Sequence, residues 1–161
     1  MTTDPKTSTA SAASAASSER PLSGPEMLER AMQGFRLYED GQFEEARAVF
    51  TDLVRMDPSE GYYQTALGAI ALAEEDLDGS LTHLDEALRL NPEDSSALVN
   101  RGEVHLRLGN ILEGTRDFAR AVELDPENKD PLTERARILA ADALRSAEAA
   151  QRDAAKDGVS S

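Results

Sequence analysis

The chain has 161 residues with a formal net charge of -14, 40% hydrophobic residues and no cysteine. This length and apolar content allow one domain with terminal tails, and the lack of cysteine excludes a disulfide framework, a thiol nucleophile and a cysteine metal site. No apolar run approaches the roughly 20 residues that a membrane-spanning helix needs, so we expect no membrane insertion.

The acidic excess lies between residues 25 and 130. Residues 1–24 carry two acidic and two basic side chains, and residues 131–161 carry five of each. An acidic surface repels phosphate backbones, whereas nucleic-acid binding depends on Lys and Arg side chains that neutralise phosphates. We therefore expect neutral or basic protein partners and no nucleic acid.

The N-terminal segment contains small and polar residues. Residues 7–18 are only Thr, Ser and Ala, which offer no large apolar side chain for burial, so residues 1–24 are predicted to form a disordered tail. The start also lacks the basic and apolar regions of a secretory signal. Order is expected to begin with a helix that Ser23 caps, with Pro25 in its first turn and Glu26 bonding back to the cap.

An apolar residue, then Asp or Asn, then Pro recurs every 34 residues, at 56–58, 90–92 and 124–126. The residue before a proline is biased out of the α region, so each phrase is expected to end a helix. Two more series share the period, one of glycines and one of small residues: Gly34, Gly68 and Gly102, and Ala46, Ser80 and Gly114. The two series are expected to face each other where the two helices of a unit cross closely.

These periods divide a folded domain of residues 25–156 into three units and a final helix. The expected bounds are residues 27–60, 61–94 and 95–128 for the units, about 131–156 for the final helix, and 157–161 for a tail. Gly41 and Gly109 are expected to turn the chain between the two helices of the first and third units, whereas the acidic turn 74–78 of the second unit lacks a glycine.

A 34-residue unit with this pattern of glycine, small residue and Asp/Asn-Pro resembles the tetratricopeptide repeat. The resemblance implies an all-α fold, a right-handed superhelix of three helix-turn-helix repeats with a C-terminal capping helix. No repeat buries its apolar face alone, so the core is expected to form where the repeats and the capping helix stack.

The ionisable residues show no catalytic motif. Neighbouring carboxylates are expected on turns and solvated helix faces, whereas acid–base catalysis needs a sheltered pair with separated pKa values. His83 and His105 stand in different repeats without a metal-ligand partner one turn away, and His105 is interpreted as a packed core imidazole. The acidic turn 74–78 lacks the oxygen spacing and glycine of a calcium loop, which leaves at most a weak cation site. We predict no enzyme, no cofactor and no metal site.

Tetratricopeptide arrays bind peptides on a concave surface formed mainly by the first helix of each repeat. Transferred to this sequence, the family's register gives ten candidate partner-binding residues: Leu28, Phe35, Tyr38, Tyr62, Thr65, Ala69, Leu72, Val99, Glu103 and Leu106. This mostly apolar lining predicts that a peptide or helical segment is held by hydrophobic anchors. The alternative is that several of these residues are core residues between repeats or are covered by the C-terminal helix.

A narrower resemblance rests on residues 37–43, 66–69 and 102–109. With three repeats, an acidic composition and a short chain, these phrases resemble the class II chaperones of type III secretion over about residues 27–128. The resemblance implies a bacterial cytoplasmic protein that holds secreted translocator proteins in its groove. The Ser/Ala-rich start replaces that family's leading dimerisation helix, so the oligomeric state is left open. The alternative function is a generic scaffold or adaptor subunit with no chaperone role.

Overall fold

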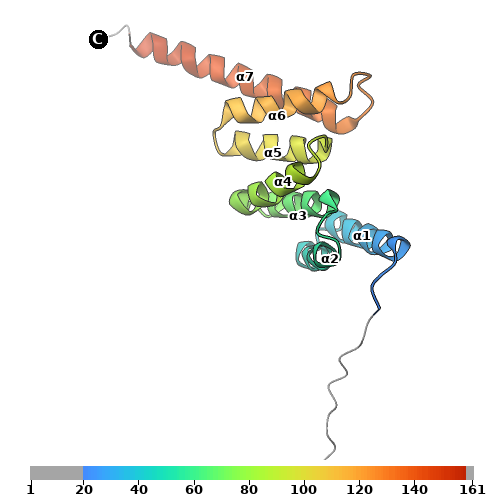
Figure 1. Cartoon of the computed structure of the whole chain (residues 1–161). Coiled ribbons are helices and arrows are strands. Elements are labelled where there is room, and N and C mark those ends of the chain that lie inside the picture. Colours follow the sequence, from blue (N-terminus) through green and yellow to red (C-terminus); the bar gives the residue numbers. More distant parts are fainter. Residues whose placement is uncertain (1–19, 159–161) are drawn as a thin grey trace, which may run out of the picture.

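A computed structural model of the chain describes residues 20–158 (Figure 1). Within this range the chain is all α-helical, with seven helices and no strand: α1 Gly24–Glu39, α2 Phe43–Met56, α3 Gly61–Ala73, α4 Leu77–Leu90, α5 Ser95–Arg107, α6 Ile111–Glu123 and α7 Pro131–Asp157. The described residues exclude 1–19, which belong to the predicted disordered segment 1–24. They also exclude 159–161, which belong to the predicted tail 157–161.

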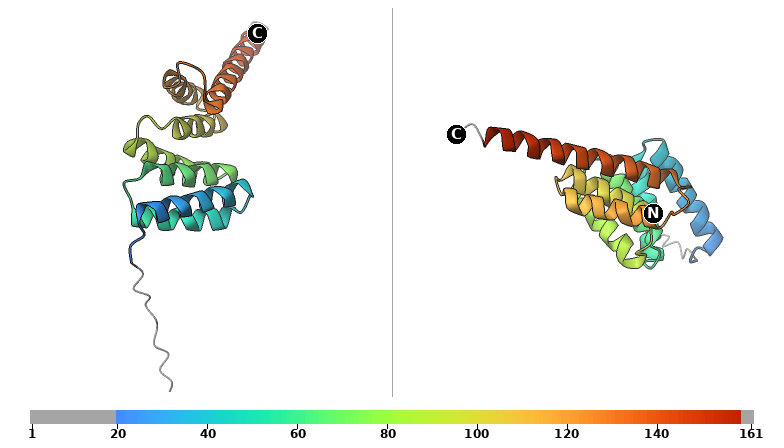
Figure 2. Two further views of the ribbon diagram at one scale, coloured as in Figure 1. Left: turned by 90° about the vertical axis from the view of Figure 1, so that its right-hand side faces the viewer. Right: turned by 90° about the horizontal axis from the view of Figure 1, so that it is seen from above.

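The helices stack as three pairs followed by a single helix. The pairs are α1 with α2, α3 with α4 and α5 with α6, and α7 packs against both α6 and α5. In the left view of Figure 2 the pairs lie one above another, and the C-terminal part of α7 projects well beyond them. The predicted all-α array of three helix pairs and a capping helix is thus confirmed. None of the helices within residues 20–158 combines the length and the apolarity needed to cross a membrane.

Acidic side chains cap the N-termini of several of these helices, and these carboxylates account for part of the negative net charge. Asp76, Asp94 and Asp130 accept hydrogen bonds from backbone N–H groups in the first turns of α4, α5 and α7, at 3.0, 3.0 and 2.9 Å. At α1 the predicted cap is present, because Glu26 Oε2 accepts the N–H of Ser23 at 2.7 Å. Carboxylates here satisfy N–H groups that lack a partner within the helix and complement its dipole.

The turn inside each pair has the same backbone conformation in all three repeats. Gly41 and Gly109 adopt positive φ angles of 75° and 82°, and Glu75, midway between them in the 34-residue register, adopts 62°. The left-handed region favours glycine because it has no Cβ. Glu75 therefore takes a strained conformation where the second repeat lacks the glycine of the other two.

Close helix crossings explain the glycine series. In the second repeat, Ser80 Oγ donates a hydrogen bond to the Gly68 carbonyl at 2.8 Å, so the small residue reaches the glycine's backbone as predicted. The surface of Gly68 itself is covered by a larger neighbour, because a Cβ added there would lie 2.5 Å from Leu84 Cγ. Phe118 covers Gly102 in the same way, with Cε1 at 2.6 Å from such a Cβ.

The apolar core has two parts that share α3. One contains Phe50, Leu53 and Leu67 and joins the first repeat to α3; the other contains Leu84 and Phe118 and continues through the third repeat to α7. Since α3 contributes buried residues to both parts, damage to this helix is expected to separate the first repeat from the rest.

A charged cluster links α4, α5 and α6 beside this core. Arg101 on α5 donates from Nε and Nη2 to the buried Asp117 carboxylate at 2.7 and 2.8 Å, and from Nη1 to Asp85 at 2.8 Å. The hydrogen bond to Asp117 is the main cause that raises the pKa of Arg101. The cluster keeps one buried carboxylate neutralised in a chain whose acidic residues outnumber its basic ones.

Candidate functional site

The described residues enclose one apolar cavity to which several helices contribute. Its volume is about 230 Å³, and its lining comes from α1, α2, α3, α5 and α7. We call it the central cavity, defined by Phe35, Tyr38, Phe50, Tyr62, Thr65, Ala66, Ala69, Ile70, Ser96, Asn100, Leu132 and Arg135. Convergence of apolar side chains with a few polar groups from separate elements is typical of a binding site.

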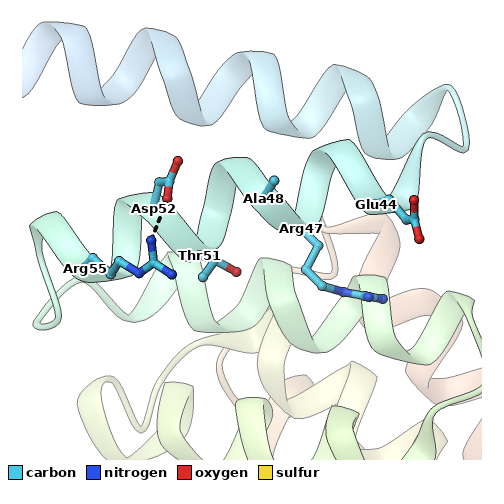
Figure 3. A pocket seen from close by; sticks show the side chains of 6 residues that line it. All are labelled: Glu44, Arg47, Ala48, Thr51, Asp52 and Arg55. Carbon is cyan, nitrogen blue, oxygen red and sulfur yellow. Dashed lines mark hydrogen bonds and ion pairs between the residues drawn. The ribbon is translucent and has the colours of Figure 1, made fainter. Parts of the chain in front are cut away.

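Larger hollows on the outer helices have a different character. Figure 3 shows the six side chains that line a hollow between Glu44 and Arg55, all of which come from α2 and are spread along it. The volume of this hollow is about 390 Å³. A hollow of about 640 Å³ on α4 is lined mainly by polar side chains, including His83 and Arg89. These outer faces lack the converging apolar walls of the central cavity, which therefore remains the candidate site.

Aromatic side chains form one wall of the central cavity. Phe35, Tyr38, Phe50 and Tyr62 all line it, out of four Phe and three Tyr in the whole chain. The rings of Phe50 and Tyr62 meet edge to face with centroids 6.1 Å apart, and those of Phe35 and Tyr38 lie 6.4 Å apart. Phe35 and Tyr62 are each 45% exposed, so a ligand here would remove aromatic surface from water.

One hydrogen bond joins two of the helices around this wall. Thr65 Oγ1 donates to Asp94 Oδ2 at 2.7 Å, which ties α3 to the N-terminus of α5. Burial, and then the nearby Asp94 charge, raise the pKa of Tyr62. The Tyr62 hydroxyl is therefore protonated at neutral pH and can donate a hydrogen bond.

Polar side chains complete the lining of the central cavity. Ser96 and Asn100 project from α5, one turn apart, and Arg135 comes from α7. Arg135 pairs with Glu103, whose side chain is only 10% exposed and which also accepts a hydrogen bond from Arg107 at 2.7 Å. One buried carboxylate thus lies between two guanidinium groups.

The ten candidate residues fall into two groups in the structure. Five of them line the central cavity: Phe35, Tyr38, Tyr62, Thr65 and Ala69. The others lie elsewhere: Leu28 is 63% exposed on α1, Leu72 and Val99 are core residues, Leu106 packs against the core, and Glu103 is buried beneath the two arginines. Packing of α7 against α5 explains the placement of the residues from the third repeat.

The register overlooked several residues of the cavity. Asn100 follows Ser96 by one helical turn, a spacing that places both on one face of α5. On α7, Arg135 follows Leu132 by one turn. The 34-residue period does not predict which face of α7 points toward the cavity, because this helix has no counterpart in the repeats.

Groups that could act in catalysis or metal binding are dispersed over the described residues. Within this range, no three of the His, Cys, Asp and Glu side chains lie close enough to hold a metal ion. His83 Nδ1 lies 2.9 Å from Gln64 Oε1, and burial lowers the pKa of His83. In the acidic turn, Glu74 pairs with Arg47 and Asp76 caps α4, so two of its carboxylates already have partners.

Known proteins show similarity in sequence and in fold. Hsp70-Hsp90 organizing protein 2 of Arabidopsis thaliana is 33% identical over 70 residues, 44% of this chain and 12% of the relative. The translocator chaperone SycD of Yersinia enterocolitica has a TM-score of 0.70 at 20% identity, covering 79% of this chain and 89% of that chain. PcrH of Pseudomonas aeruginosa, in complex with the chaperone binding region of PopD, has a TM-score of 0.71 at 21% identity, covering 79% and 97%.

The matched part of this chain corresponds to only 5 to 12% of the length of such curated relatives. A family model described as a tetratricopeptide repeat matches residues 32–95 and 65–129, which together form most of the chain. These matches, the 34-residue register and the stacked helix pairs agree. The chain belongs to the tetratricopeptide repeat family.

Proposed function

We propose that this chain is a non-enzymatic protein-interaction module that binds a peptide or helical segment of a partner in the central cavity. The observation that carries the proposal is the aromatic wall, because Phe35 and Tyr62 stay nearly half exposed beside a cavity built from five helices. Large exposed aromatics in such a hollow are typical hydrophobic anchors for peptide recognition.

We further propose a chaperone role for secreted translocator-type proteins, in the bacterial cytoplasm. Support comes from the fold likeness to SycD and to PcrH, which was crystallised with the chaperone binding region of PopD. A generic adaptor without a chaperone role is the second candidate, and the sequence similarity to the Arabidopsis organizing protein favours it. Both functions use the same cavity and differ in the partner.

We expect that Phe35→Ala and Tyr62→Ala will each weaken peptide binding about tenfold or more, since buried aromatic anchors carry most of the energy of such interfaces. Binders selected from a displayed library of random dodecapeptides provide the ligands, and fluorescence anisotropy measures their affinities. Circular dichroism should show unchanged helicity, because both side chains are partly exposed in the free chain.

Leu112→Ala is the matched control, because Leu112 is also exposed, at 58%, but lies on α6 and does not line the central cavity. It should bind the selected peptides as wild type does. Equal losses of peptide affinity in all three variants would contradict binding in the central cavity. Selected peptides whose affinity does not depend on Phe35 and Tyr62 would contradict it as well.

A further inference from the structure

We propose that the bound segment carries an internal acidic side chain, Asp or Glu, whose carboxylate binds Arg135 while neighbouring apolar side chains fill the central cavity. This inference rests on the peptide-binding function proposed above and specifies its partner. It follows from the polarity of the cavity, from the charge balance around Glu103 and from the apolar surface on both sides of Arg135.

The polar side chains of the cavity present hydrogen-bond donors that the protein itself leaves available. Among residues 20–158, Glu103 is the one group with which Arg135 pairs, and neither Ser96 nor Asn100 forms a side-chain hydrogen bond to another residue. A guanidinium has five N–H donors and no acceptor, and the hydroxyl and amide can also donate. An acceptor with several lone pairs therefore complements these polar side chains best.

The charge balance favours an anionic acceptor. Arg107 and Arg135 share the single carboxylate of Glu103, so the cluster keeps one net positive charge. The Arg135 side chain is 50% exposed and lines the cavity, and a guanidinium has enough N–H donors to bind a second carboxylate. An ammonium group placed there would be repelled, and a neutral amide would form weaker hydrogen bonds.

Other acidic groups near the cavity do not cancel this preference. Asp94 lies near Tyr62 and two residues before Ser96, and its carboxylate already accepts hydrogen bonds from Thr65 and from the N–H of Ala97. The net charge of the whole chain acts over longer distances, which salt screens beyond about 8 Å at physiological ionic strength. A partner segment that is neutral or basic overall can therefore still place one carboxylate on Arg135.

The surface on either side of Arg135 indicates an internal residue of the partner and not its C-terminus. Ile138, one turn further along α7, is 54% exposed, and Met32 and Phe35 on α1 are 53% and 45% exposed. Apolar surface thus continues beyond the arginine in one direction and beyond the aromatic wall in the other. A bound chain is expected to continue across both, which places the carboxylate on a side chain within the segment.

The test uses dodecapeptides selected on the full chain and then synthesised with acetylated N-termini and amidated C-termini, so that no terminal carboxylate is present. Each acidic binder is compared with its Glu→Gln or Asp→Asn analogue on wild type, Arg135→Gln and Arg107→Gln. Arg107 is the matched control, because it pairs with the same carboxylate but does not line the cavity. We expect the amide analogue to bind wild type about tenfold more weakly and to bind Arg135→Gln with unchanged affinity. Arg107→Gln should keep part of the tenfold difference, because it removes one positive charge from the cluster but leaves Arg135 in the cavity lining.

The outcomes separate this inference from the proposed function. Selected peptides that require Phe35 but show no Asp or Glu enrichment, or that lose equal affinity for Arg107→Gln and Arg135→Gln, overturn the inference and leave the function in place. Binding that appears only when the C-terminal amide is replaced by a free carboxylate also overturns it. If no peptide binds through Phe35, both proposals are wrong.

Discussion

Gly68→Leu is expected to lower the free energy of unfolding by about 3 kcal/mol, the upper part of the range for an overpacked core. Even the first added carbon would lie 2.5 Å from Leu84 Cγ, and Leu84 is fully buried. The hydrogen bond from Ser80 to the Gly68 carbonyl holds the two helices at this distance, so they cannot separate without losing it. Thermal or urea unfolding followed by circular dichroism measures the effect.

The damage should also reduce cooperativity, because α3 joins the two parts of the core. Gly24→Ala is the control, since a Cβ at Gly24, in the first turn of α1, meets nothing within 4 Å. This variant should be neutral or slightly more stable, because Ala is a better helix former. A melt of Gly68→Leu that equals or exceeds wild type would show that α3 and α4 do not cross closely at this glycine.

Arg101→Leu is expected to cost about 3 to 5 kcal/mol of folding free energy, because it leaves Asp117 as an uncompensated buried charge. The Asp117 side chain is 10% exposed, so water cannot replace the two hydrogen bonds from Arg101. The same chain tolerates a leucine at the matching position of the second repeat, where Leu67 is buried. Poor packing of a leucine at position 101 therefore does not account for the expected loss of folding free energy.

The double variant Arg101→Leu/Asp117→Val separates charge from packing, since Val49 occupies the position of Asp117 in the first repeat. It should recover most of the lost stability, because a well-packed apolar pair often replaces a buried ion pair at little cost. Arg89→Leu is a surface control, and it should leave the unfolding midpoint unchanged because the Arg89–Glu86 pair is exposed. A double variant as unstable as the single one would contradict this account of the cluster.

Much of the fold could be predicted from the sequence, because the features that end and join helices are local. The three Asp/Asn-Pro phrases predicted the ends of α2, α4 and α6, and each of these helices ends within a residue or two of its phrase. Glu75 shows where local rules fail: sequence patterns favour glycine at a left-handed position, and only the packed repeats on either side impose that conformation on a glutamate.

The candidate site was less predictable, because it depends on a helix outside the repeat. Phe35, Tyr38 and Tyr62 follow the family's register and line the central cavity. Val99 follows the same register but is fully buried, because α7 covers the third repeat. Whether α7 turns Arg135 or a neighbouring side chain toward the cavity is decided by its tertiary packing on α5 and α6, and no periodic pattern in the sequence contains that information.

A partner segment is expected to bind in the central cavity and not on the outer helix faces. Amide NMR spectra of the full chain, recorded during titration with a selected dodecapeptide, test it most directly. We expect chemical-shift changes to concentrate around Phe35, Tyr62 and Asn100 and at the start of α7, with the outer face of α2 unaffected. Shift changes confined to the hollow between Glu44 and Arg55, or to the outer face of α4, would contradict binding in the central cavity.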